Sequence, residues 1–116
     1  MKLLEKTDDE ILQIVNPIMD NLMDASTEID YKRFITGVSE RMKNLTTEKS
    51  LNEICTDYQS KKGFFTDREF VSLFRREESI AIIWKQNFSK IRGDFVAEAV
   101  FIEENGIVVV DHAFVF

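Results

Sequence analysis

Few of the 116 residues carry side chains suited to catalysis or metal binding. The chain has one histidine, His112, and one cysteine, Cys55, which are too few ligands for a His/Cys zinc site. The acidic run Asp8-Asp9-Glu10 matches a helix start rather than a calcium-binding loop. The sequence contains no Gly-rich phosphate loop, serine nucleophile elbow, His-Glu-x-x-His pair or Cys-x-x-Cys pair. We therefore expect no catalytic residue, no metal site and no cofactor.

Four side chains with polar tips are candidates for a ligand-binding pocket: Tyr31, Tyr58, Trp84 and His112. His112 is the one side chain whose charge changes near neutral pH. Catalysis would require a nearby acid, and Asp111 would point to the opposite face of the strand. Packing is the favoured interpretation for all four residues, because each lies in an apolar stripe. The alternative is a pocket for a small apolar ligand that all four line.

Glu98 and Asp111 are two acids that the expected strand pairing brings close together. Neighbouring carboxylates raise one another's pKa and can serve as an acid/base pair. These two face away from the Phe-rich surface on which we expect a pocket. The interpretation we favour is that they set the specificity of an interface, near Lys85 or Arg75.

Composition restricts the classes of partner. Fifteen Lys and Arg against 21 Asp and Glu give a formal net charge of −6, which disfavours binding to nucleic acid or anionic lipid. No apolar stretch approaches the roughly 18 residues of a membrane span. Cys55 has helical spacing to Leu51 and Tyr58, so it is expected to be a buried thiol in a reducing compartment. We predict one cytoplasmic domain over residues 1–116, with neither nucleic acid nor membrane as a partner.

The first half of the chain has the hydrophobic spacing of helices. Thr7 and Glu10 form a capping-box pattern, and an apolar stripe for one side of a helix follows it. Pro17 interrupts this helix and predicts a kink, or a fresh start with Asn16 as cap. The stripe consists of Ile11, Leu12, Val15, Ile18, Met19 and Leu22.

Two further helices are expected before the strands. Asp30 is suited to cap a second helix, whose buried side runs from Tyr31 to Leu45. A third helix opens at Thr46 or Thr47 and ends at Gly63, which permits a left-handed C-cap. The sequence thus predicts three helices in all.

The second half is rich in Phe, Val and Ile, which is typical of strands. We expect strands at residues 70–76, 80–88, 95–102 and 107–116. Asn105-Gly106 favours a two-residue type I′ turn, which pairs Glu104 with Ile107 and sets the register. One face then pairs Phe101 with Val110, Ala99 with His112, Ala97 with Phe114, and Phe95 with Phe116. The reverse face pairs Ile102 with Val109, Val100 with Asp111, Glu98 with Ala113, and Val96 with Val115.

Both faces of this hairpin are apolar, whereas a sheet with one solvated side alternates apolar with polar residues. The helices can cover one face, so the other face requires a second cover. A symmetric homodimer is the commonest solution. Its predicted interface residues are Val96, Glu98, Val100, Ile102, Val109 and Asp111.

The order of elements and three local segments resemble short bacterial and archaeal members of the nuclear transport factor two-like superfamily. The resemblance covers about residues 11–116. It implies a cystatin-like α+β fold in which three N-terminal helices pack on a curled four-stranded antiparallel sheet. The superfamily includes isomerase-like and dehydratase-like enzymes as well as binding and dimerisation modules, so the fold does not select an activity. The segments are Pro17-Ile18-Met19-Asp20-Asn21-Leu22, the helix start Asp30-Tyr31 with Phe34, and Ile82-Ile83-Trp84-Lys85.

Together these observations predict a non-catalytic module that forms a homodimer or binds a small apolar ligand. The alternative is a lyase-like or isomerase-like enzyme that uses a pocket between the helices and the sheet.

Overall fold

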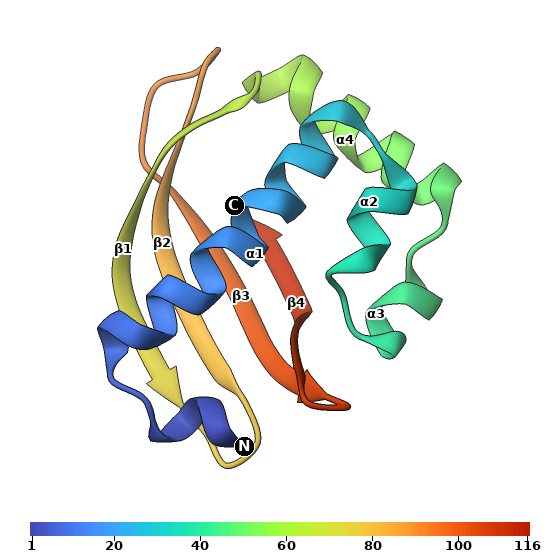
Figure 1. The fold of residues 1–116 in the computed structure, drawn as a ribbon. Coiled ribbons are helices and arrows are strands. Elements are labelled where there is room, and N and C mark those ends of the chain that lie inside the picture. The colour runs from blue at the N-terminus through green and yellow to red at the C-terminus, as the bar shows by residue number, and fades with distance from the viewer.

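The computed structural model describes residues 1–116 as an α+β fold with an open antiparallel sheet (Figure 1). The helical elements are a 3-10 helix, η1 (Lys2–Glu5), and four α-helices, α1 (Asp8–Glu28), α2 (Tyr31–Thr36), α3 (Glu40–Leu45) and α4 (Glu48–Lys62). The strands are β1 (Phe65–Arg75), β2 (Ile80–Phe88), β3 (Phe95–Glu104) and β4 (Ile107–Val115), in the spatial order β1-β2-β3-β4. The predicted α+β class and four antiparallel strands are confirmed.

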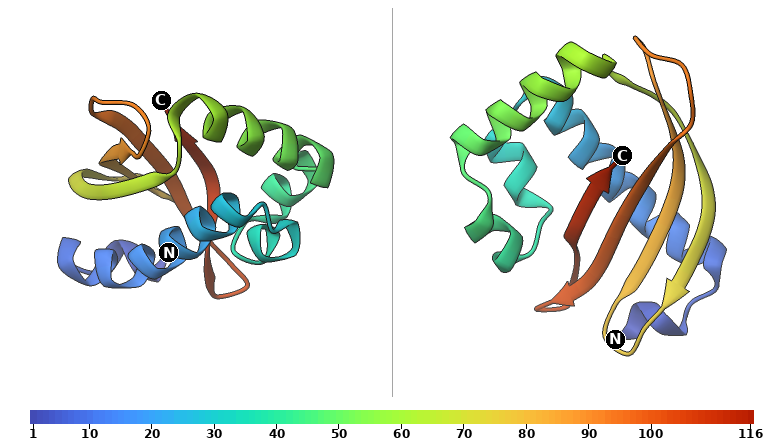
Figure 2. Two further views of the ribbon diagram at one scale, coloured as in Figure 1. Left: turned by 90° about the horizontal axis from the view of Figure 1, so that it is seen from above. Right: turned by 180° about the vertical axis from the view of Figure 1, so that it is seen from behind.

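One helix covers one side of the sheet, and no helix covers the other side. Helix α1 crosses the sheet diagonally, and α2, α3 and α4 lie beyond the β4 edge (Figure 1). Seen from behind, no helix crosses in front of the strands (Figure 2, right). We call this uncovered side the open face. None of the helices combines the length and the apolar character that a bilayer-spanning helix needs.

Local caps define the helix starts. The Thr7 side chain accepts from the backbone N–H of Glu10, and the Glu10 carboxylate accepts from the Thr7 N–H; these bonds hold the pKa of Glu10 below its usual value. Asp30 and Thr47 cap α2 and α4 as predicted. Helix α1 is continuous through Pro17, so the alternative of a fresh start there is wrong. One missing hydrogen bond does not end a helix whose buried stripe continues on both sides.

The helix predicted from Asp30 to Leu45 is divided into α2 and α3, so the count of three helices is wrong. Val38 is 3% exposed and forms a parallel bridge with Val110 of β4. The Ser39 N–H donates to the Val110 carbonyl at 2.8 Å, and the Val110 N–H donates to the Gly37 carbonyl at 2.9 Å. These bonds to β4 replace helical bonds over residues 37–39, and Ser39 then caps α3.

The first strand begins at Phe65 rather than at residue 70. The Phe65 ring stacks on Tyr58, with centroids 5.0 Å apart, and lies 5.3 Å from the Phe88 ring. Aromatic contacts with α4 and β2 therefore extend the strand over a stretch that contains Thr66, Asp67 and Arg68. An irregularity in its pairing with β2 between Phe65 and Arg68 accommodates these residues, and a second lies between Phe70 and Ser72.

The β3–β4 hairpin follows the predicted register near its turn. Asn105 and Gly106 have φ values of 54° and 78°, as a type I′ turn requires, and pairing runs as expected from Glu104–Ile107 to Phe101–Val110. Beyond this point a bulge shifts every pair by one residue. The observed pairs are Val100 with His112, Ala99 with Ala113, Glu98 with Phe114 and Ala97 with Val115.

Asp111 is the extra residue at the bulge. The consecutive β3 residues Phe101 and Val100 pair with Val110 and His112, so Asp111 has no partner on β3. Its carboxylate accepts from Ser39 Oγ at 2.7 Å and from Arg41 Nε at 3.1 Å. These bonds turn Asp111 toward α3. The shift places His112 and Phe114 on the open face, and Ala113 and Val115 on the side of the helices.

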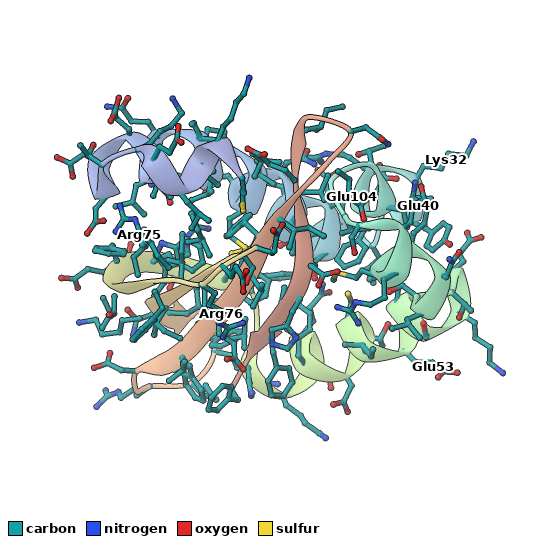
Figure 3. The ribbon with its side chains drawn as sticks, turned by 90° about the horizontal axis from the view of Figure 1, so that it is seen from below. Lys32, Glu40, Glu53, Arg75, Arg76 and Glu104 are labelled. Carbon is teal, nitrogen blue, oxygen red and sulfur yellow. The ribbon has the colours of Figure 1, made fainter.

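The main core lies between α1 and the strands. Trp84 and Phe101 are its largest fully buried side chains, and their rings meet edge to face at 6.4 Å. Carboxylates near the hairpin attach η1 and the start of α3 to the sheet. Glu103 accepts from the backbone of η1, and Glu104, which lies beside Glu40 in Figure 3, accepts from the Glu40 N–H at 3.2 Å.

Candidate functional site

An apolar cavity of about 570 Å³ lies between the four α-helices and the C-terminal half of β4. Its volume is within the range of about 300 to 1,000 Å³ that is typical of small-molecule sites. Of its 19 lining residues, 15 are hydrophobic, so an occupant would be held mainly by burial of apolar surface. The lining residues are Met19, Leu22, Met23, Ser26, Phe34, Met42, Thr46, Leu51, Ile54, Cys55, Asp57, Tyr58, Lys62, Phe65, Phe88, Ala113, Phe114, Val115 and Phe116.

Helix α4 forms one wall of the cavity. Leu51, Cys55, Tyr58 and Lys62 follow one another at helical spacing and all line it. The wall is therefore apolar in the first turns of α4 and ends at a cation in the last turn.

A short chain of hydrogen bonds joins the few polar groups of the wall. Ser26 Oγ lies 2.9 Å from the Tyr58 hydroxyl and 3.2 Å from Cys55 Sγ. Gln59 Nε2 donates to the Tyr58 hydroxyl at 3.4 Å and to the Thr27 carbonyl at 3.1 Å. Burial raises the pKa of the Cys55 thiol, and the bond with Ser26 only partly offsets this effect. Cys55 is therefore a neutral thiol at pH 7, in line with the expected buried structural role.

The structure does not bring the four predicted pocket residues together. Tyr58 lines the cavity. The Tyr31 hydroxyl donates to the carbonyl of Thr46 at 3.0 Å, so it supports the wall from outside. Trp84 is 2% exposed in the main core. His112 lies on the open face, with Nε2 3.5 Å from Glu98 Oε1.

The open face carries five of the six predicted interface residues. Val96, Val100 and Ile102 are partly exposed on β3, and Val109 lies opposite Ile102 but is only 8% exposed. The bulge adds Phe114, which is 56% exposed and also lines the cavity at the β4 edge. Glu98 is on this face as predicted, but Asp111 is not, because its carboxylate is bound to α3.

The predicted pair of interacting acids is not formed. Burial raises the pKa of Asp111, but the bonds from Ser39 and Arg41 and the Arg41 charge outweigh it, so the pKa lies below its usual value. This is opposite to the shift that a neighbouring carboxylate causes. Lys85 pairs with Glu69 at 3.2 Å and Arg75 with Asp8 at 2.7 Å, so neither cation pairs with Glu98 or Asp111.

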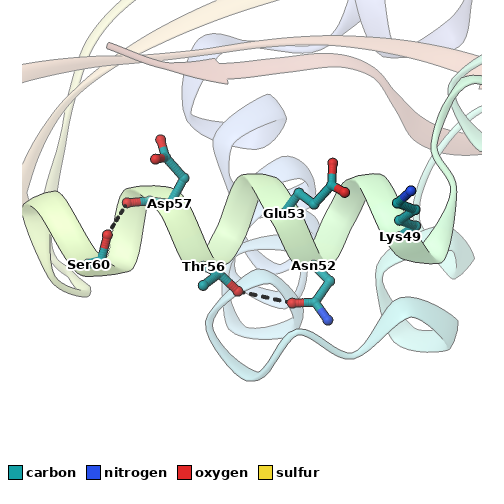
Figure 4. A pocket seen from close by; sticks show the side chains of 6 residues that line it. All are labelled: Lys49, Asn52, Glu53, Thr56, Asp57 and Ser60. Carbon is teal, nitrogen blue, oxygen red and sulfur yellow. Dashed lines mark hydrogen bonds between the residues drawn. The ribbon is translucent and has the colours of Figure 1, made fainter.

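A second depression runs along the outer side of α4 (Figure 4). All six lining residues come from this helix, and none is hydrophobic. No second element closes the depression, so we interpret it as a solvated helix surface. Its lining residues are Lys49, Asn52, Glu53, Thr56, Asp57 and Ser60.

Sequence reasoning missed most of the cavity lining. Phe34 and Met42 were expected together on one helix, whereas they reach the cavity from two separate ones. Ser26 was not predicted as a pocket residue, and it reaches the cavity from α1. One signal was available: Met19, Met23 and Met42 all line the cavity, and methionine suits irregular, adaptable apolar surfaces.

Three solved structures share this fold at low sequence identity. The SEC-C motif containing protein RPA3114 from Rhodopseudomonas palustris has a TM-score of 0.57 and 9% identity, over 89% of each chain. A DUF4783 family protein from Bacteroides uniformis has a TM-score of 0.51 and 12% identity, over 83% of this chain and 93% of that one. Bdellovibrio bacteriovorus Bd1075 has a TM-score of 0.55 and 12% identity; the match covers 92% of this chain and only 40% of Bd1075.

At these identities the likeness shows a common α+β fold and nothing of activity. No protein-family model matches the chain, and no curated protein matches it in sequence.

Proposed function

We propose that the chain is a non-catalytic module of the nuclear transport factor two-like fold that binds a small apolar ligand in the cavity beside β4. The order of helices and strands and the three similar sequence segments support the fold assignment. The observation that carries the function is the cavity itself, which has ligand-sized volume and an apolar lining.

The chemistry of the lining favours binding over catalysis. Cys55 is a neutral thiol at pH 7, because burial raises its pKa. His112 lies outside the cavity on the open face. The two charged residues of the lining are Asp57 and Lys62, and Asp57 is paired with Lys61 at 2.9 Å. The cavity thus lacks a paired acid and base within reach of one bound molecule.

Filling the cavity is expected to abolish binding of a neutral apolar probe, decan-1-ol. Ala113 lines the cavity from β4, so Ala113→Phe places a ring in the space that the probe needs. We expect isothermal titration to show binding by the natural protein and at least about tenfold weaker binding by the variant, which corresponds to 1.4 kcal/mol. Equal affinities, or no binding by the natural protein, would contradict the proposal.

His112→Phe is the matched control for this titration. His112 is the preceding residue of the same strand, but it lies on the open face opposite Val100. The substitution adds an aromatic ring without reducing the cavity. Its affinity for decan-1-ol should equal that of the natural protein.

We also propose that a second copy of the chain covers the open face. The supporting observation is the partly exposed apolar surface formed by Val96, Val100 and Ile102 with no helix over it. The same face carries Lys85 and Glu98, so a two-fold arrangement can place opposite charges against each other.

Val100→Lys is expected to convert the dimer to a monomer of 13.6 kDa, because it introduces a charge at the centre of the apolar surface. Sedimentation velocity at micromolar concentration measures the change. Gln13→Lys adds the same charge on the exposed side of α1 and should leave the dimer intact. A natural protein that sediments as a monomer would remove this proposal and leave ligand binding untouched.

A further inference from the structure

We infer that the preferred ligand is an elongated apolar molecule with one anionic end, such as a carboxylate, and that Lys62 binds this end. The inference rests on the proposed ligand-binding function and specifies the ligand class. It follows from the shape of the cavity wall and from the position of one cation on it.

The wall formed by α4 is long and polarised. Leu51 lies in the first turn of the helix and Lys62 at its last residue, and both line the cavity. At 1.5 Å per residue their positions are about 16 Å apart along the axis. Cys55 and Tyr58 occupy the stripe between them. A ligand that follows this wall is extended, with its apolar part beside Leu51 and its polar end beside Lys62.

Lys62 is a cation without an acidic partner. Its Nζ lies 5.5 Å from the ring centroid of Phe88 and 5.0 Å from that of Phe95. Contact with two aromatic faces positions the ammonium group and removes part of its water shell. Lys62 is the one cation among the residues that line the cavity, and it forms no ion pair.

Nearby negative groups do not neutralise this cation. Asp57 also lines the cavity, but its carboxylate is bound to Lys61 at 2.9 Å. The negative end of the α4 dipole opposes an anion, but several of its carbonyls are occupied. Gly63 N–H donates to the Gln59 carbonyl, and the Lys90 backbone N–H donates to the Lys62 carbonyl, each at 3.0 Å. The Lys90 ammonium group binds the carbonyl of Ser60.

A titration that compares decanoate with decan-1-ol tests the inference, because the two probes differ only in the end group. We expect the natural protein to bind decanoate about three- to fivefold more tightly at low ionic strength, the size of a partly exposed ion pair. Lys62→Gln should remove this preference and leave the affinity for decan-1-ol unchanged. Lys61→Gln is the matched control, because Lys61 is adjacent and exposed but is paired with Asp57.

The outcomes separate this inference from the function on which it rests. Equal affinities of the natural protein for the two probes, or a preference that persists in Lys62→Gln, would overturn the role of Lys62 while leaving the cavity as a binding site. If only Lys61→Gln loses the preference for decanoate over decan-1-ol, the carboxylate binds on the outer side of α4 and not beside Lys62. Binding of neither probe would overturn the proposed function as well.

Discussion

Replacing Arg68 with alanine is expected to lower the free energy of unfolding by about 2 to 3 kcal/mol. The Arg68 side chain is only 13% exposed, which is unusual for an arginine. Its guanidinium group lies 5.1 Å from the Trp84 ring, 2.6 Å from Asp20 Oδ1 and 3.0 Å from Met23 Sδ. The substitution therefore removes packing, a cation–π contact and a link between β1 and α1 together.

Lys85→Ala is the control for this prediction. Lys85 forms an ion pair with Glu69 on the neighbouring strand, but both side chains are more exposed, at 42% and 72%. An exposed pair contributes little, so a much smaller loss of stability than that of Arg68→Ala is expected. Urea denaturation at pH 7 measures both variants. Equal effects of the two substitutions would show that Arg68 is an ordinary surface cation.

Asp111→Ala is expected to destabilise the protein by about 2 kcal/mol at pH 7, because it leaves polar partners unpaired. Ser39 is fully buried and donates its hydroxyl proton to the Asp111 carboxylate at 2.7 Å. Arg41 binds both the carboxylate and the main-chain carbonyl of Asp111. Together these contacts attach α3 to β4, which lie on two sides of the cavity. Ligand affinity should therefore fall with stability.

The effect of Asp111→Ala should also depend on pH. The folded state lowers the pKa of Asp111, so the charge of this carboxylate stabilises the fold at pH values above its unfolded pKa, near 4. This stabilisation is lost as the pH falls through the lowered pKa of the folded state. The difference in unfolding free energy between the natural protein and the variant should therefore shrink below about pH 4.

Asp24→Ala is the control for the pH dependence expected of Asp111→Ala. Asp24 is 71% exposed and lies 3.6 Å from Arg33, so its removal should change stability little at any pH. Urea denaturation from pH 3 to pH 7 measures the three proteins. A constant difference for Asp111→Ala across this range would contradict the assigned role of the charged carboxylate.

Features that depend on neighbouring residues in the chain were predictable from the sequence. The caps at Thr7, Asp30 and Thr47 and the Asn105-Gly106 turn are examples, because each depends on contacts within a few residues. The first pairs of the hairpin followed from the turn.

Features that depend on distant contacts were not predictable. The break at Gly37–Ser39 exists because this segment bonds to β4, more than 70 residues away in sequence. The bulge at Asp111 exists because Ser39 and Arg41 bind its side chain. A bulge reverses the facing of every later residue, so the error at Asp111 misplaced His112 and Phe114 together.

The break at Gly37–Ser39 and the bulge at Asp111 also limited the prediction of the candidate site. Tyr58 was identified because its position depends only on the period of α4. Lys62 was not predicted as a site residue, since its proximity to the cavity arises from contacts of α4 with β2 and β3.

The most direct test of ligand binding in the cavity uses the four methionines. Met19, Met23 and Met42 line the cavity, whereas Met1 lies at the far end of the fold beside η1. In protein labelled with carbon-13 at the methionine methyl groups, decan-1-ol should shift the NMR signals of the three cavity methionines and leave Met1 unchanged. Unchanged signals from all four, or equal shifts that include Met1, would contradict the proposal that the cavity is a binding site.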